Sequence, residues 1–138
     1  MTYETVLPIW NALRERFQTK VEAIPEQALS LQLGQTNVGG LLYHTAEVEF
    51  MFAEWFFGKK TTEKLSKPEQ MEDYIKLLKA SNDHFIQAMK ELPEEEWQQS
   101  KDSPLGDTTP LEAVGRLMNH AGIHAGQISL IQKYGQEG

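Results

Sequence analysis

Three of the four histidines in this sequence stand at spacings that suit a metal site. His120 and His124 are four residues apart, so on a helix their imidazoles lie one turn apart on the same face and offer two nitrogen ligands to one metal. His44 lies much earlier in the chain and would supply a third ligand from a facing helix. Three neutral nitrogens with open coordination positions suit Zn²⁺ best, with Ni²⁺ or Fe²⁺ as alternatives. The spacing therefore predicts a divalent metal ion held by His44, His120 and His124.

A purely structural role is the alternative for each histidine. On helical wheels His44, His120 and His124 share a face with apolar residues, and this predicts that all three point into the core. A single inward histidine is more often a hydrogen-bonded core residue than a metal ligand. Three together favour the metal, because each buried imidazole without a partner costs about 1–3 kcal/mol and a cation removes that cost. His84 lies about 120° from the apolar stripe of its own helix, so we expect it to face solvent.

Two further side chains are candidates for contacts with the ligands. Glu47 lies one turn from His44, and Gln127 lies three residues after His124. Either side chain could hold a metal-bound water or fix the tautomer of an imidazole. Glu47 lies about 60° off the apolar stripe, so a solvated charge at the rim of the helix is its alternative role.

The motifs that are missing narrow the chemistry. Ala121 stands where metalloproteases of the H-E-x-x-H type carry their glutamate base. The chain has no E-x-x-H motif, which di-iron bundles need. It also has no G-x-S-x-G, Walker or G-x-G-x-x-G motif, which disfavours serine hydrolases, P-loop proteins and dinucleotide-binding enzymes. Because the chain has no cysteine, any thiol chemistry needs a thiol from outside.

The histidines fall within a pattern of four amphipathic helices. Apolar residues recur at three- and four-residue steps over residues 6–17, from a cap at Thr36 or Asn37 to about residue 57, from residues 67–69 to Pro93, and from about residue 110 to 131. No segment alternates polar and apolar residues in the manner of a strand, so we expect no sheet. The pattern predicts an all-α, four-helix bundle with long connections at 20–36 and 92–108, forming a single domain over residues 1–138.

The two halves of the chain also resemble each other. Ile24-Pro25-Glu26-Gln27 precedes the second helix as Leu92-Pro93-Glu94-Glu95 precedes the fourth. This suggests an internal duplication of a helix pair, which would put His44 and His120 at equivalent places.

Small residues gather on one face of the fourth helix, opposite the histidines: Gly115, Gly122, Gly126 and Ser129. Glycine inside a helix costs about 1 kcal/mol relative to alanine, so three on one face predict that another helix approaches closely there. That helix would belong either to this chain or to a second subunit.

The charge of the chain argues against two kinds of partner. With 13 Lys and Arg against 20 Asp and Glu, the net charge of −7 would repel nucleic acid and an anionic membrane surface alike. No segment has the run of roughly 18 apolar residues that a membrane span needs, and the first residues lack a basic, then apolar, leader. We therefore expect a soluble, cytoplasmic protein that binds neither nucleic acid nor membranes.

The sequence around the histidines resembles a known family. Residues 39–43 before His44, and above all the string His120-x-x-x-His124-Ala125-Gly126-Gln127-Ile128, are similar to the DinB-like superfamily of metal-binding four-helix bundles. The similarity spans essentially the whole chain. It implies that His44, His120 and His124 are the metal triad and that the protein is a homodimer. For some members it also implies a transferase activity that uses a low-molecular-weight thiol such as bacillithiol or mycothiol, and a related branch is a mycothiol-dependent maleylpyruvate isomerase.

Two functions of different classes remain open. In the first, the protein is a metal-dependent thiol S-transferase, in which the metal lowers the pKa of a small-molecule thiol and presents it to an electrophile without a general base. In the second, it is a non-catalytic binding or scaffold protein that contains a metal. An open three-ligand site favours the enzyme, because structural zinc sites usually have four protein ligands.

Overall fold

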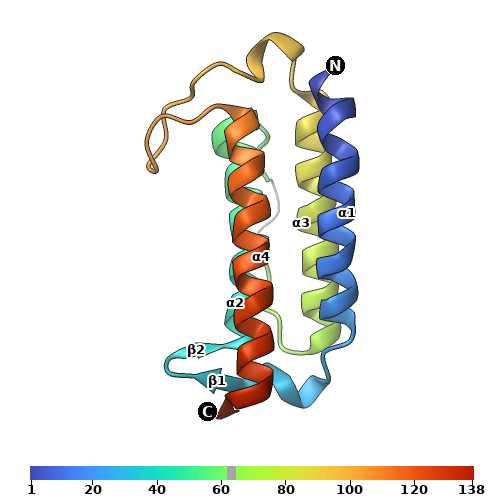
Figure 1. Ribbon diagram of the computed structural model, residues 1–138, viewed down its shortest axis with the longest axis vertical. Helices are drawn as coiled ribbons and strands as arrows, with labels where there is room; N and C mark the ends of the chain where they lie inside the picture. The colour runs from blue at the N-terminus through green and yellow to red at the C-terminus, as the bar shows by residue number, and fades with distance from the viewer. Residues whose placement is uncertain (62–64) are drawn as a thin grey trace.

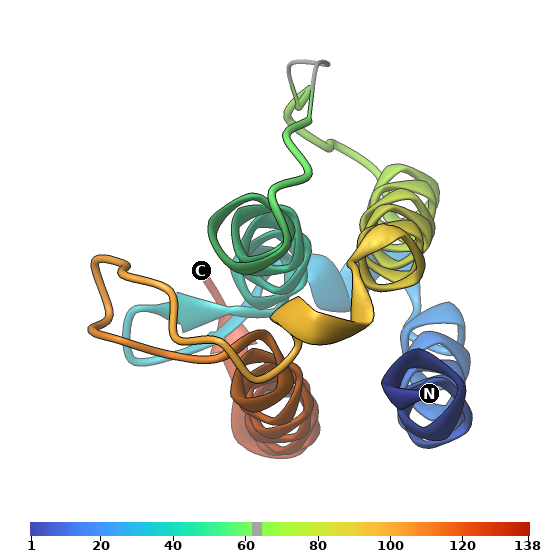
Figure 2. The same cartoon turned by 90° about the horizontal axis from the view of Figure 1, so that it is seen from above.

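Four long helices lie side by side in the computed structural model, which describes residues 1–61 and 65–138. They are α1 (Thr2–Glu22), α2 (Val38–Phe57), α3 (Met71–Glu91) and α4 (Pro110–Tyr134), and Figures 1 and 2 show them packed as a bundle. The prediction of an all-α, four-helix bundle is confirmed, although α1 extends well beyond the predicted residues 6–17 at both ends. Within the described ranges, no helix combines the length and apolar character needed to cross a bilayer.

The ends of the helices that carry the histidines follow local capping rules. Asn37 caps α2, with its side-chain oxygen accepting a hydrogen bond from the backbone nitrogen of Gly40 at 2.6 Å. Gly58 ends α2 with a φ of +69°, a conformation that favours glycine. Thr109 caps α4 by accepting a hydrogen bond from the backbone nitrogen of Glu112. Pro110 occupies the first turn, where a backbone N–H would have no partner within the helix, so the missing N–H of proline costs nothing.

The direction of the helices was not predictable from their periodicity. Helices α1 and α4 run one way and α2 and α3 run the other, as Figure 1 shows. Because α2 and α3 are parallel, the end of α2 at Phe57 and the start of α3 at Met71 lie at opposite ends of the bundle. The two predicted long connections contain short 3₁₀ helices, at Glu26–Ser30 and Glu94–Glu96, each capped by a proline. The equivalent position of these two 3₁₀ helices, each before a histidine-bearing helix, agrees with the similarity of the two halves of the sequence.

A small antiparallel sheet lies at one end of the bundle. Strands β1 (Leu31–Leu33) and β2 (Thr36–Asn37) form a hairpin around Gly34, whose φ is +64°, and β3 (Gln136–Glu137) pairs with the other edge of β1. The expectation of no sheet was wrong here. Strands of two or three residues are too short to show an alternating pattern, and the pairing with β3 joins segments about 100 residues apart.

A buried polar cluster lies between two apolar parts of the core. Along α1, Arg14 lies between Trp10 of one apolar cluster and Phe17 of the other. Its Nε and Nη2 donate to the carboxylate of Glu49 on α2 at 2.7 and 3.0 Å, and Ser81 of α3 donates to the same carboxylate at 2.6 Å. Arg14 and Glu49 are only 1% and 2% exposed. This cluster, which the sequence analysis did not identify, ties three helices together at the middle of the bundle.

Candidate metal centre

The imidazoles of His44, His120 and His124 come together between α2 and α4. Each offers a ring nitrogen, and these nitrogens all lie within 4.8 Å of one another. Nε2 of His120 and Nε2 of His124 are 2.9 Å apart, and the ring of His44 lies 5.0 and 5.5 Å from theirs, centroid to centroid. Among the residues described, no other group of three histidine, aspartate or glutamate side chains is gathered in this way.

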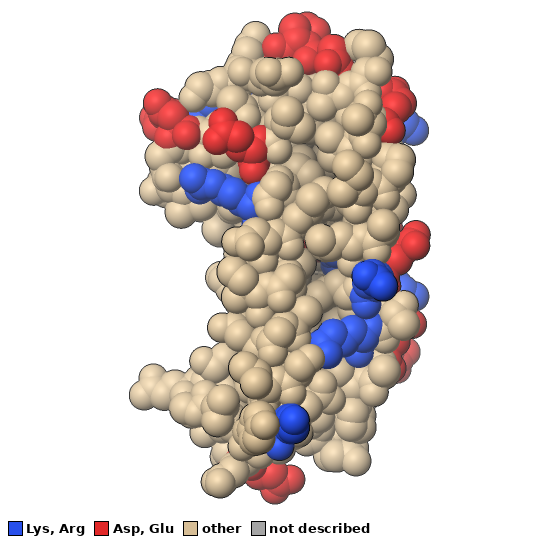
Figure 3. Space-filling model, viewed as in Figure 1, with Lys and Arg blue, Asp and Glu red and all other residues tan. Residues whose placement is uncertain are grey.

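The bundle leaves this group accessible on the side where α2 and α4 meet. The β1–β2 hairpin projects from that side at one end of the bundle, and the connection before α4 projects at the other end (Figures 1 and 2). Figure 3 shows that the surface is hollowed between the two projections. His44 lies in the first half of α2, and His120 and His124 lie in the middle of α4. The three histidines are therefore located along the bundle between the two projections.

The three histidines differ in burial, and this corrects one prediction. His124 is buried and His120 is partly buried, but the side chain of His44 is 49% exposed. The expectation that His44 points into the core was therefore wrong. Helix α2 packs against both α3 and α4, and the centre of its buried face, near Thr45 and Glu49, lies about 120° around the helix from His44. His44 is consequently at the edge of that face, and solvent can reach the three-histidine cluster beside it.

The other ring nitrogens of two histidines have oxygen partners. Nδ1 of His124 lies 2.7 Å from Oε1 of Gln127, and Nδ1 of His44 lies 3.2 Å from Oε1 of Glu47. An amide oxygen and an ionised carboxylate only accept hydrogen bonds, so each Nδ1 carries the proton and donates it. The Nε2 lone pair of each ring is then left for a metal, in the manner of histidine ligands held by an outer partner. Glu47 and Gln127 thus contact their histidines in a way that would fix a tautomer, which is one of the two roles that the sequence offers for them.

The buried pair of imidazoles is electrostatically biased toward the neutral form. Burial, and to a smaller extent the neighbouring His124 and His44, together lower the pKa of His120 to about 4. Burial also lowers the pKa of His124, against an opposing effect of its hydrogen bond with Gln127. Neutral imidazole is the form that binds a metal, so these two residues are ready to act as ligands at neutral pH.

The geometry of the donors fits a divalent ion such as zinc. Zinc–nitrogen bonds of about 2.0–2.1 Å in a tetrahedral arrangement place ligand nitrogens roughly 3.4 Å apart. The observed separations, from 2.9 Å to at most 4.8 Å, lie on both sides of that value. The donor set therefore suits a metal with three protein ligands and an open position.

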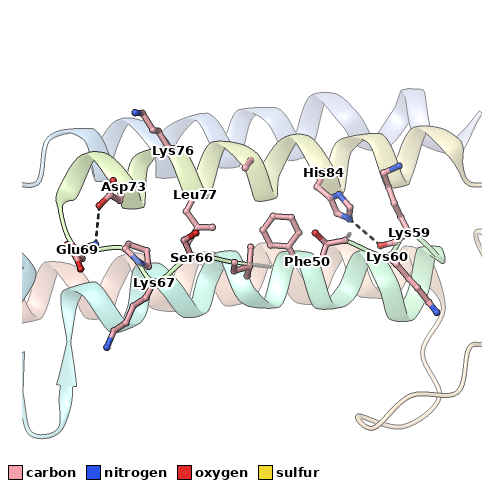
Figure 4. A pocket seen from close by; sticks show the side chains of 14 residues that line it. Phe50, Lys59, Lys60, Ser66, Lys67, Glu69, Asp73, Lys76, Leu77 and His84 are labelled. Atoms are coloured by element: carbon pink, nitrogen blue, oxygen red, sulfur yellow. Dashed lines mark hydrogen bonds between the residues drawn. The ribbon is translucent and has the colours of Figure 1, made fainter. Parts of the chain in front are cut away.

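His84 lies in a different cavity, which Figure 4 shows between α2 and α3. Its Nε2 lies 3.2 Å from the backbone oxygen of Lys59, and its ring lies 5.1 Å from that of Phe50. His84 is partly buried, so the expectation that it faces solvent was wrong. The reason is that the chain leaving α2 passes beside α3, and Lys59 covers a face that a helical wheel of α3 alone would leave open. No second histidine lines this cavity.

Three glycines on one face of α4 have open space beside them in the described part of the chain. A Cβ atom built on Gly115, Gly122 or Gly126 would meet nothing within 4 Å. The prediction that another helix approaches this face closely is therefore wrong for the helices of this chain, and a second subunit is the alternative that remains.

The sequence and the fold of this chain are similar to those of known proteins. The family model of the DinB superfamily matches residues 9–128. A crystal structure of a DinB-like protein from Bacillus cereus superposes with a TM-score of 0.80 at 19% identity, covering 94% of this chain and 90% of that one. The DinB-like protein YjoA of Bacillus subtilis superposes with a TM-score of 0.75 at 15% identity, covering 97% and 96%. At these identities the likeness concerns the fold. The comparison with curated proteins gave no match.

Proposed function

The chain belongs to the DinB superfamily, and on that premise we propose that it is a metal-dependent thiol S-transferase whose site is His44, His120 and His124. The observation that carries the proposal is the cluster of three imidazole nitrogens within 4.8 Å, reachable from solvent beside the half-exposed His44. Within the described ranges the cluster has no fourth histidine or carboxylate. A site closed by four protein ligands would instead favour a structural metal.

The residues around the cluster have separate roles in this proposal. His44, His120 and His124 hold the ion, with zinc first and nickel or iron as alternatives. Gln127 and Glu47 accept from Nδ1 of His124 and His44 and so keep each Nε2 free for the metal. When bound, the metal supplies Lewis acidity, which lowers the pKa of a thiol that enters the open position.

The transfer itself needs no acid or base from the chain. The sulfur of a low-molecular-weight thiol forms a bond to the electrophilic carbon of a small-molecule cosubstrate, and the leaving group departs with its electron pair. The thiol proton goes to solvent, which reaches the site beside His44. Because the chain has no cysteine, both reactants come from outside, and the reduced thiols of the cytoplasm fit the location that we propose for the protein.

We also propose that the protein is a homodimer, with a second copy against α4 at Gly115 and Gly126. A Cβ atom built on either residue would meet nothing within 4 Å, and the nearby Ile123 and Leu130 are 51% and 53% exposed.

The experiment is a conjugation assay with the metal-loaded protein. Bacillithiol, mycothiol, glutathione and coenzyme A are each offered with a generic soft electrophile, and the metal content is measured on the same sample. We expect at least one thiol to be conjugated faster than in the absence of protein, and His120→Ala to abolish the acceleration while His84→Ala retains it. No acceleration with any thiol at full metal occupancy would favour the alternative, a metal-containing binding or scaffold protein.

A further inference from the structure

A groove separates α1 from α4 on the side of α4 that faces away from the histidines. It has a volume of about 780 Å³ and is lined by one face of α1, from Pro8 to Lys20, and by Ala121, Gly122 and Ala125 of α4. Gly122 is two residues from both His120 and His124 and so projects to the opposite side of the helix. The groove is therefore separate from the three-histidine site and does not depend on its chemistry.

The lining of the groove is apolar because small residues of α4 face α1. Ala121 and Phe17 form a buried floor, 2% and 4% exposed, while Ile9 on the rim is 58% exposed. A Cβ atom on Gly122 would meet nothing within 4 Å. The two helices are consequently held apart at this place without side chains that fill the space, which leaves apolar surface open to a ligand.

The groove carries positive charge, although the net charge of the chain is negative. The protein has 20 acidic and 13 basic residues, yet the described residues that line the groove include Arg16 and Lys20 and no acidic residue. Figure 3 shows basic side chains beside α4 over the lower half of α1. Arg16 makes no ion pair with any residue in the described ranges, and the positions three and four residues away from it hold no acid.

Lys20 closes the same end of the groove. Its Nζ donates to Oγ of Ser129 on α4 at 2.6 Å, so its partner is a neutral hydroxyl, and no salt bridge joins Lys20 to an acidic residue in ranges 1–61 and 65–138. The two cations lie one turn apart on α1. Together they form a cationic end to an otherwise apolar groove.

The length of the groove limits the length of a ligand that lies in it. From Pro8 to Lys20 the groove spans about 18 Å of helix at 1.5 Å per residue. From Arg16 back to Pro8 the apolar stretch is about 12 Å, roughly the length of a ten-carbon chain.

We propose that the groove between α1 and α4 binds an amphipathic carboxylate, with its apolar chain along α1 and its carboxylate on Arg16 and Lys20. A guanidinium binds a carboxylate through two parallel hydrogen bonds, and the apolar surface of the groove and of the chain leave water together. The carboxylate replaces the missing acidic partner of Arg16.

The test is calorimetric titration of the full-length, metal-loaded protein with decanoate below its micelle concentration. We expect one decanoate per chain. Arg16→Gln should weaken binding at least tenfold, and Gly122→Leu should abolish it, because leucine fills a space that is open in the folded protein. The matched controls are Arg116→Gln, an exposed arginine outside the groove, and Gly115→Leu, two turns away on the same face of α4.

The proposal is overturned by any of three results. The first is equal binding to Arg16→Gln and Arg116→Gln, and the second is equal binding to Gly122→Leu and Gly115→Leu. The third is binding of decyltrimethylammonium, which has the same chain and the opposite charge, as tightly as decanoate. If no decanoate binds and light scattering shows that Gly122→Leu alone dissociates a dimer, the groove belongs to a second copy of this chain and the proposal also fails.

Discussion

The oxygen atoms of Glu47 and Gln127 determine which nitrogen their histidines present to the cluster. Gln127 makes the shorter contact, 2.7 Å from Nδ1 of the buried His124, whereas Glu47 lies 3.2 Å from Nδ1 of the exposed His44. A hydrogen bond to a buried ring restrains its orientation as well as its tautomer. Gln127 is thus the better place to test whether these contacts serve metal binding.

Gln127→Ala should lower the affinity for zinc by about 10- to 100-fold, because it removes the hydrogen-bond partner that Nδ1 of His124 has among the described residues. Competition with a chromogenic chelator measures the affinity. Gln132→Ala, at an exposed position on the same helix, is the matched control and should bind zinc as the wild type does. Equal affinities of the two variants would show that the Gln127 contact does not support a metal ligand.

The lowered pKa of His120 predicts how the metal-free protein responds to acid. In the unfolded chain histidine takes up a proton near pH 6.5, but in the folded protein His120 does so only near pH 4. Between these values the unfolded state binds more protons, so the stability that is present above pH 6.5 is lost as the pH falls toward 4. Because the ring is partly exposed to solvent, screening limits the loss to on the order of 1 kcal/mol.

Urea unfolding of the metal-free protein at pH 7.0 and 5.0 measures this effect. His120→Gln should lose less stability than the wild type over that range, in which the carboxylates are still ionised. The same loss in both proteins would mean that His120 is not held neutral by its surroundings.

Single residues were predictable where only helix geometry mattered. The four-residue spacing of His120 and His124 is enough to put two imidazoles together, and Gln127, three residues after His124, lies on the same side of the helix about one turn further along. The exposure of His44 and the burial of His84 were not predictable, because each depends on which other element covers its helix. A helical wheel contains no such information.

At the scale of the elements, the pair of Arg14 and Glu49 joins α1 to α2 and α3. Its charges are almost fully buried, and each has several hydrogen-bond partners. Glu49→Ala should destabilise the protein by about 3–5 kcal/mol, because Arg14 remains buried without its counter-charge. The measurement is the free energy of unfolding in urea.

An exposed ion pair provides the control for this prediction. Glu72 and Lys76 are 3.1 Å apart on α3, with side chains 71% and 72% exposed. Glu72→Ala should change the free energy of unfolding little, because solvent screens exposed pairs. A loss in Glu49→Ala no larger than in Glu72→Ala would contradict a structural role for the buried pair.

The helices were predictable because each carries a sustained apolar stripe, and Asn37 and Thr109 also mark the starts of α2 and α4. Helix α1 has no side-chain cap at its start, so its bounds were not predictable. The sheet was not predictable either, because its strands have two or three residues and depend on the end of α4 meeting β1. The centre of the buried face of α2 was misplaced for a related reason. Both α3 and α4 pack against this helix, so its apolar residues occupy more than half of its circumference. The apolar stripe that was predicted to centre on His44 is only one edge of this wider buried face.

At the scale of the whole molecule, the bundle followed from four amphipathic segments in 138 residues, which can bury their stripes only against one another. The parallel arrangement of α2 and α3 did not follow. A connection of 13 residues, from Gly58 to Gln70, is long enough for either a return along the bundle or a loose hairpin. Packing between the helices, rather than the connection, determines the direction.

The open glycine face of α4 predicts the oligomeric state. Light scattering at micromolar concentration should give twice the 15.7 kDa of one chain. Gly126→Leu should shift the protein toward the monomer, because the new side chain is tolerated within one chain but keeps a second helix at a distance. Circular dichroism checks that the variant is folded. A wild-type protein that remains at 15.7 kDa would contradict the proposed homodimer.

Elemental analysis of the purified protein tests the central claim, that the three imidazoles bind a metal, most directly. We expect about one divalent metal ion per chain in the wild type and in His84→Ala, whose histidine lies in the separate cavity between α2 and α3. His44→Ala, His120→Ala and His124→Ala should each lose most of the metal, because two nitrogens hold an ion far less firmly than three. Full metal content in all three of these variants, with loss in His84→Ala, would contradict the assignment of the site.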